Sequence, residues 1–225
     1  MGFERNAQSI DRDSADYPGR VAGYLAADAP RVLTLVGDRQ ILQGVQIALI
    51  CSVSCPGSVV IRTFDTIRKV RDAGLVVAGG FHSPMERECL HFLLRGVKPV
   101  VLCPACGMDS FELGSEERRA VDAGRLSVLS IFDERFTKAT PELASQRNDF
   151  VAALSGAVFV PHAVPGGKAE AAARRALARG QVVVTFDDAE NRHLTDYGAT
   201  HVSQGGIPEI RSISETCGLL PFLAR

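Results

Sequence analysis

Short apolar runs alternate with amphipathic stretches along most of the chain. Val45–Cys51 is a continuous apolar run of the kind that forms a buried strand. In Ser58–Asp72 the apolar residues recur at helical spacing, and Gly74 follows where such a helix would end. The other predicted strands are Val32–Val36, Leu75–Ala78, Lys98–Cys103, Leu126–Ile131, Ala157–Val160, Gln181–Thr185 and Thr200–Val202. The other predicted helices are Tyr17–Ala27, Ser83–Gly96, Ser115–Ala123, Thr140–Leu154 and one from Lys168 to Gly180.

This alternation predicts right-handed βαβ units and therefore an α/β fold. We expect a doubly wound, mostly parallel Rossmann-like sheet with helices on both faces. Residues 1–16 are expected to be a flexible arm, 17–187 the domain itself, and 188–225 an extension that packs on the same domain. In such sheets ligands bind beyond the carboxyl ends of the strands, so we expect the site on loops.

Composition and net charge limit the classes of binding partner and the cellular location that we expect. The 225 residues carry a formal net charge of −1, so a nucleic-acid partner requires a local basic patch. No run approaches the roughly 20 apolar residues that cross a bilayer, which predicts no membrane association. The polar N-terminal stretch lacks a signal-peptide core, so we expect a cytoplasmic protein whose six cysteines are reduced.

The stretch Gly156–Gly180 is the most informative segment. A buried strand is followed by a loop containing Gly166 and Gly167, and an alanine-rich helix begins near Lys168. Unpaired N–H groups and partial positive charge at a helix N-terminus attract anions. Glycines let a phosphate approach the backbone closely. This segment therefore predicts a phosphate site, although an ordinary strand-to-helix turn with a solvated lysine has the same pattern.

Small polar residues follow the other strands as well, and we expect them to form a wall of backbone N–H donors. An arginine in the helix before Ala157–Val160 could reach the same crevice. The predicted phosphate-binding residues are Ser52, Ser54, Gly57, Ser58, Gly80, His82, Ser83, Arg147, Gly166, Gly167 and Lys168.

Known cofactor motifs are absent. CSVSCPGS follows the Val45–Cys51 strand and does not match G-x-G-x-x-G, so NAD or FAD binding is disfavoured. The Walker pattern fails because His162 and Ala169 occupy two of its required positions. Cys103 and Cys106 form a CxxC pair, but Cys51 and Cys55, the obvious further ligands, belong to a strand two positions away. We therefore predict neither a cofactor nor a metal.

Acid–base chemistry has only weak candidates, namely His82, Glu86 and Glu170. His82 and His162 both follow strands, where they could act as acid, base or phosphate ligand, or simply be rim histidines. Glu86 stands three residues after Ser83, and helix capping explains that spacing equally well. No residue is assigned as a nucleophile.

Several motifs together resemble the Rossmann-like domain of the DNA-processing protein A family, also called Smf. IALICS resembles the strand that ends in the family's Gly-Ser-Arg, with Val53 at the position of the arginine. VVAGGFHSPMERECL resembles its Ser-Gly-Leu-Ala-Arg-Gly-Ile-Asp loop. QRNDFVAALSGAVFVPHA resembles its Arg-Asn-Arg stretch, and GGKAEAAARRALARGQVV resembles its Ser-Gly-Ser stretch. The Pro-Gly-Gly loop is also similar to that of the wider LOG-like nucleotide-binding group.

This resemblance implies that the protein binds a nucleotide or single-stranded DNA through phosphate groups. It also implies a role in DNA processing and a homodimer. A LOG-like nucleotide hydrolase, or a nucleotide sensor without turnover, is the alternative that these residues leave open.

Overall fold

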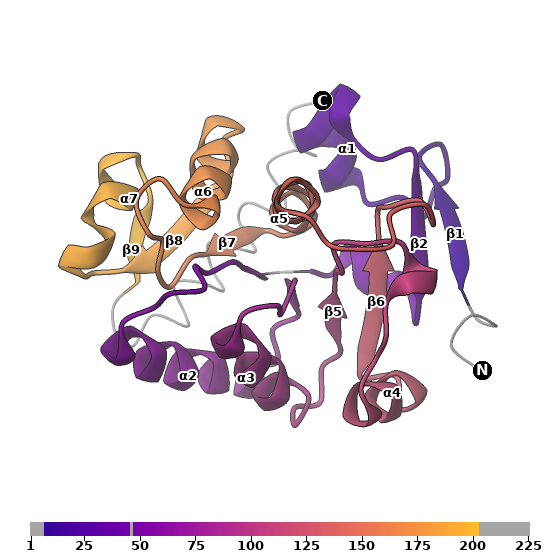
Figure 1. The fold of residues 1–225 in the computed structure, drawn as a ribbon, viewed down its shortest axis with the longest axis horizontal. Coiled ribbons are helices and arrows are strands. Elements are labelled where there is room, and N and C mark those ends of the chain that lie inside the picture. Colours follow the sequence, from indigo (N-terminus) through magenta and orange to yellow (C-terminus); the bar gives the residue numbers. More distant parts are fainter. Residues whose placement is uncertain (1–6, 46, 203–225) are drawn as a thin grey trace.

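The computed structural model describes residues 7–45 and 47–202, which form a nine-stranded sheet covered by helices (Figure 1). The strands are β1 (Gln8–Asp11), β2 (Val32–Val36), β3 (Ile47–Leu49), β4 (Val77–Gly79), β5 (Val100–Leu102), β6 (Leu126–Ser130), β7 (Ala157–Phe159), β8 (Val182–Phe186) and β9 (Thr200–Val202). The helices are α1 (Gly19–Leu25), α2 (Gly57–Asp72), α3 (Pro84–Leu93), α4 (Ser115–Asp122), α5 (Pro141–Leu154), α6 (Lys168–Ala178) and α7 (Arg192–Asp196).

The sheet is doubly wound, as predicted. Its order is β1-β2-β6-β5-β4-β3-β7-β8-β9, and the pairs from β6 to β9 are parallel. From β3 the chain winds outward through β4 and β5, whereas from β7 it winds the other way through β8 and β9. The topological switch point therefore lies between β3 and β7, where this class of sheet places its ligands.

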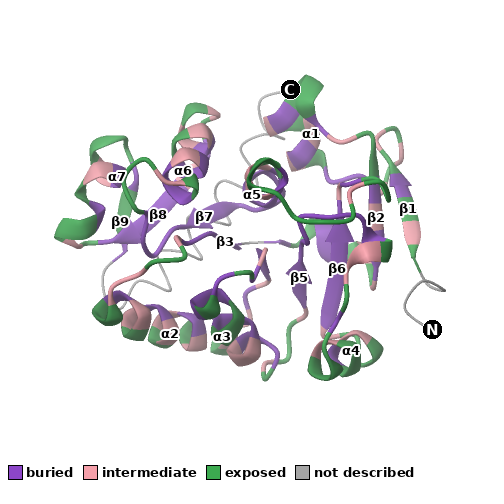
Figure 2. Cartoon of the chain, in the orientation of Figure 1, coloured by how far each residue is buried: buried purple, intermediate pink, exposed green. Residues whose placement is uncertain are grey.

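Side chains of alternate strand residues supply two separate cores. Ala48 of β3 points to the core beneath α1, α5 and α6, whereas Ile47 and Leu49 point to the core beneath α2, α3 and α4. Figure 2 shows the strands buried between these two helical layers, with exposed residues on the outer helix faces. Burial on both faces explains why the strands are continuous apolar runs.

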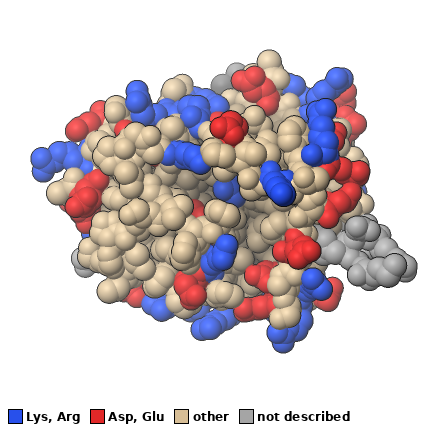
Figure 3. Space-filling view, viewed as in Figure 1, with Lys and Arg blue, Asp and Glu red and all other residues tan. Residues whose placement is uncertain are grey.

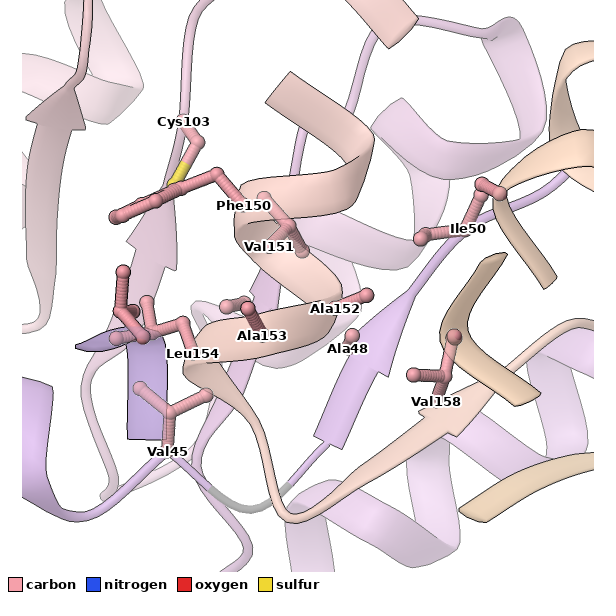
Figure 4. Packing of buried hydrophobic residues seen from close by; sticks show 14 of the residues in the cluster. Val45, Ala48, Ile50, Cys103, Phe150, Val151, Ala152, Ala153, Leu154 and Val158 are labelled. Atoms are coloured by element: carbon pink, nitrogen blue, oxygen red, sulfur yellow. The ribbon is translucent and has the colours of Figure 1, made fainter. Parts of the chain in front are cut away.

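Helix α5 packs across the middle of the sheet (Figure 4). Its last two turns are buried from Phe150 to Leu154, and small residues such as Ala48 and Ala78 face it from the strands. In Figure 4 the Phe150 ring lies against the Cys103 side chain at the end of β5. Because α5 leads into β7, which runs parallel to β3, the first half of α5 lies at the carboxyl edge of the strands.

The structure differs from the sequence prediction in two segments, Gln8–Asp11 and Arg192–Asp196, while the sheet is mostly parallel as predicted. Gln8–Asp11 lies in the expected flexible arm, yet it forms an edge strand antiparallel to β2, and Ile10 is its one buried residue. Strand β2 in turn pairs antiparallel with β6, so this edge of the sheet is not parallel. Helix α7 was not predicted. Strand β9 was predicted, but residues 203–225 of the expected extension lie outside the described residues.

Within residues 7–45 and 47–202, no helix combines the length and apolar character needed to cross a membrane.

Candidate phosphate-binding site

A cavity of about 480 Å³ opens at the switch point of the sheet. It is lined by the loops after β3, β4 and β7, by the first turns of α3 and α6 that follow two of these loops, and by the first half of α5. Its lining residues are Cys51, Ser52, Val53, Ser54, His82, Ser83, Glu86, Ala144, Arg147, Asn148, Val164, Gly166, Gly167, Lys168 and Ala169. The structure thus brings together eight of the eleven predicted residues: Ser52, Ser54, His82, Ser83, Arg147, Gly166, Gly167 and Lys168.

Reciprocal hydrogen bonds join the loops after β3 and β7. The Ser52 backbone N–H donates to the His162 carbonyl at 3.1 Å. The Val164 N–H donates to Ser52 Oγ at 2.9 Å, which leaves the hydroxyl hydrogen of Ser52 able to donate elsewhere. These bonds fix the relative positions of the two loops on either side of the switch point.

Glu86 ties the loop after β4 to the end of β3. Its Oε1 accepts from the Cys51 N–H at 3.0 Å, and its Oε2 accepts from the N–H groups of His82 and Ser83 at 3.1 Å each. Ser83 Oγ accepts from the Glu86 N–H in return, which completes the predicted capping box of α3. The carboxylate is buried and already satisfied, so Glu86 holds the pocket wall in place.

Arg147 is the buried cation of the cavity. The residue is only 7% exposed, its Nη1 donates to the Cys103 carbonyl at 3.0 Å, and its Nε donates to Asn148 Oδ1 at 2.9 Å. Burial lowers the pKa of Arg147, and the negative charge of Glu86 acts in the opposite direction. Among the described residues, no carboxylate lies within ion-pair distance of the guanidinium. A buried charge without a direct ion-pair partner is costly, and an anion in the cavity would reduce that cost.

The loop before α6 is held by its own helix. Glu170, in the first turn of α6, accepts a hydrogen bond from the Gly166 N–H, and the Gly167 N–H donates to the Val164 carbonyl at 2.9 Å. Gly166 has a φ of 72°, the left-handed region in which a glycine is unstrained. Glu170, like Glu86, is therefore an organiser of the pocket wall.

These bonds correct the predicted wall of backbone donors. The N–H groups of Ser52, His82, Ser83, Gly166 and Gly167 all donate to protein oxygens. An incoming phosphate must therefore use other donors.

Other donors remain in the lining, among them the Ser52 and Ser54 hydroxyl groups. Within the described part of the chain, the N–H groups of Lys168 and Ala169 in the first turn of α6 have no acceptor, as is usual at a helix N-terminus. Arg147 and Lys168 also line the cavity, and both have cationic side chains.

Three predicted residues lie outside the cavity lining. Gly57 and Ser58 are exposed in the first turn of α2. Gly80 lies behind the guanidinium, because a Cβ atom on Gly80 would come 1.4 Å from Arg147 Nη1. His162 is also outside; it is buried and its Nδ1 is 3.2 Å from Asn191 Oδ1. Sequence reasoning missed the exposed Val53 and Val164 at the cavity, which carry no polar signal.

Surface charge on the face shown in Figure 3 is mixed. Figure 3 shows basic and acidic side chains interspersed over the visible face, without one continuous basic field. Glu142, in the first turn of α5, is one such exposed acid. Its pKa is lowered by its own backbone N–H, then by Thr140, and also by the positive charge of Lys168. Attraction of an anion therefore depends on a few cations inside the cavity.

Cys103 and Cys106, which form the CxxC pair, are both buried. Burial raises the pKa of Cys103 to about 12, with Arg147 acting in the opposite direction, and burial also raises the pKa of Cys106. Strand β4 separates the end of β5 from that of β3, as expected. No group of three or more potential metal ligands occurs within the residues that the structure describes.

A doubly wound sheet with a polar cavity at its switch point defines a Rossmann-like α/β protein. The chain belongs to the DNA recombination-mediator protein A family, because the model of that family matches residues 8–217. No curated protein matches the sequence.

Solved structures agree on the fold. DNA processing protein A from Streptococcus pneumoniae is 19% identical, with a TM-score of 0.77 over 92% of this chain and 75% of that one. A structure concerned with single-stranded DNA binding by DNA processing protein A from Helicobacter pylori is 18% identical. Its TM-score is 0.72 over 96% of this chain and 97% of that one. A molybdenum cofactor binding protein from Rippkaea orientalis is more distant, at 12% identity and a TM-score of 0.55, over 74% of this chain and 95% of that one.

Proposed function

We propose that this protein binds single-stranded DNA through its backbone phosphates and acts in DNA processing. The observation that carries the proposal is Arg147, a nine-tenths buried arginine in an open cavity, with no carboxylate within ion-pair distance among the described residues. Arginine suits phosphate because its fork of N–H groups matches two phosphate oxygens. Membership of the family, and the DNA-binding relative from Helicobacter pylori, support DNA as the source of that phosphate.

The cavity offers one phosphate a set of complementary donors. The guanidinium of Arg147 supplies the buried charge, and the N–H groups of Lys168 and Ala169 supply the helix N-terminus. The Lys168 side chain and the hydroxyl groups of Ser52 and Ser54 complete the set. His82 and Ser83 line the same cavity. Within this proposal the predicted Gly80 acts indirectly, by making room for Arg147.

Among the described residues, no Phe, Tyr or Trp lines the cavity, so base stacking contributes little to recognition there. Recognition through phosphates does not distinguish one base sequence from another. We therefore expect the protein to bind oligonucleotides of different sequence with similar affinity.

The test is a fluorescence anisotropy titration of a labelled oligothymidylate, repeated from about 50 to about 200 mM salt. Arg147→Gln should weaken binding by about 10- to 100-fold, since a charge-assisted hydrogen bond contributes about 1.5 to 3 kcal/mol. It should also lower the salt slope by about 0.7, the value for one phosphate contact on a single strand. Lys98→Ala is the matched control, because Lys98 is exposed just before β5 and does not line the cavity.

Binding that neither depends on salt nor weakens in Arg147→Gln would refute the proposal. Stabilisation by a mononucleotide, with no oligonucleotide binding at low salt, would favour a nucleotide-binding role instead. Homodimerisation is also part of the proposal and is supported by family membership. Light scattering of the full chain tests it, and a monomer at all concentrations would contradict it.

A further inference from the structure

Cys51 and Cys55 lie at the two ends of the loop that joins β3 to α2. Cys51 belongs to the apolar cluster on one face of the sheet and Cys55 packs against the same cluster, close enough for one thiol to influence the other. Cys51 is buried and lines the cavity, and its Sγ also contacts the His162 carbonyl at 3.4 Å. Cys55 is only partly buried and is therefore accessible to small solutes.

The surroundings make these two thiols chemically unlike. The hydrogen bond with Cys51 lowers the pKa of Cys55, against the effect of burial. Cys55 also stands directly before Pro56, the N-cap of the 16-residue α2, and the positive end of a helix favours a thiolate.

Cys51, in contrast, is held as a protonated thiol. The hydrogen bond with Cys55, then burial, then the charges of Cys55 and Glu86 raise its pKa, so it keeps its proton. Cys55 is therefore the nucleophile of the pair and Cys51 is the resolving thiol.

The other described thiols differ from this pair. Cys89 is fully buried, and burial raises its pKa. Cys103 and Cys106 are both buried, and burial raises the pKa of each. A thiol that stays protonated in the core is unreactive, because the thiolate is the nucleophile. Reactivity is therefore concentrated at the loop after β3.

We propose that Cys51 and Cys55 form an oxidation site that closes a disulfide bond at the edge of the cavity. The oxidant is hydrogen peroxide. The Cys55 thiolate attacks one peroxide oxygen, the O–O bond breaks, and hydroxide leaves as Cys55 becomes a sulfenic acid. That hydroxide removes the Cys51 proton to form water. The Cys51 sulfur then attacks the Cys55 sulfur and expels hydroxide from the S–O bond. Two electrons pass from the thiols to the peroxide.

The disulfide constrains a loop that carries two residues of the cavity, Ser52 and Ser54. The site itself does not depend on DNA binding, because it rests on the thiol pair and the N-terminus of α2. Its test can therefore be made without DNA.

Peptide mapping of the full chain after hydrogen peroxide treatment provides the test. Trypsin cleaves after Arg39 and Arg62, and the peptide between these sites carries both thiols and no other cysteine. We expect this peptide to become lighter by two hydrogens and to lose both alkylation sites. Brief alkylation of the untreated protein should modify Cys55 first.

Cys55→Ser should abolish the mass change and leave Cys51 alkylatable. Cys106→Ser is the matched control and should behave like the unaltered chain. The proposal is overturned if the peptide keeps both free thiols. It is equally overturned if Cys55 passes to a sulfinic acid while Cys51 stays free, or if either thiol is linked instead to Cys89 or Cys217.

Discussion

The guanidinium of Arg147 occupies the space that a side chain on Gly80 would need. A Cβ atom at Gly80 would lie 1.4 Å from Nη1 and 2.0 Å from Cζ of Arg147. Gly80 directly follows β4, so the glycine opens a place for the guanidinium beside the Cys103 carbonyl. The Arg147 charge can therefore be buried in the cavity only because Gly80 has no side chain.

This relationship predicts that Gly80→Ala impairs binding without contacting the ligand. The methyl group displaces the guanidinium, so oligonucleotide affinity should fall nearly as far as in Arg147→Gln. Overpacking should also cost about 1 to 3 kcal/mol of stability, measured by urea denaturation. Gly57→Ala is the matched control, because nothing lies within 4 Å of its Cβ position. If the double variant Gly80→Ala/Arg147→Ala loses the sum of both single losses in stability, the two residues do not interact in this way.

Glu86→Gln tests the role of the carboxylate that joins two loops. Glutamine keeps one acceptor oxygen, but its NH₂ group then faces backbone N–H groups that now donate to Glu86. The free energy of unfolding should fall by about 1 to 3 kcal/mol. Glu88→Gln, an exposed position on the same helix, should change it by less than about 0.5 kcal/mol. If both substitutions lowered the free energy of unfolding equally, the Glu86 hydrogen bonds would not stabilise the fold.

Glu142→Gln is expected to strengthen DNA binding. Glu142 is an exposed acid whose charge interacts with that of Lys168, and it opposes an approaching phosphate. Removing its charge should raise oligonucleotide affinity severalfold at low salt, and the gain should shrink as salt screens the charge. Glu112→Gln changes an exposed acid outside the cavity lining and should leave affinity unaltered. A gain that persists unchanged at high salt would argue against an electrostatic cause.

Tyr17 provides a prediction about alkaline pH. Its hydroxyl group donates to the Pro30 carbonyl at 2.7 Å, and burial raises its pKa from 10.0 to about 12, with Arg12 acting in the opposite direction. A raised pKa adds stability that is complete below pH 10, the unfolded value, and is lost as pH rises through about 12.

Tyr17→Phe should therefore be less stable than the unaltered chain by about 1 kcal/mol near neutral pH. That difference should close between pH 10 and about 12 in urea denaturation followed across pH. Tyr197→Phe, at an exposed tyrosine, is the control and should show no such convergence. A constant difference for Tyr17→Phe would contradict the explanation.

Local signals made most of the fold predictable. Apolar runs identified the strands that are buried on both faces, and the Ser83 capping box placed the start of α3 correctly. Gln8–Asp11 was missed because only Ile10 is buried, and one apolar residue makes no pattern. Its pairing with β2 comes from tertiary structure rather than from local preference.

The sequence predicts where the cavity lies, but not the hydrogen bonds and the buried charge of the residues that line it. The rule for parallel sheets brought Ser52, His82 and Lys168 to one edge. It could not reveal that Glu86 accepts the Cys51 N–H, because these residues are 35 positions apart. Nor does the sequence show that Arg147 is buried rather than solvated, since this depends on the space left at Gly80.

A crystal structure of the full chain with a short oligothymidylate would test the central claim most directly. We predict a backbone phosphate in contact with the Arg147 guanidinium and with the N–H groups of Lys168 and Ala169. DNA bound on another surface, with this cavity holding only water, would contradict it.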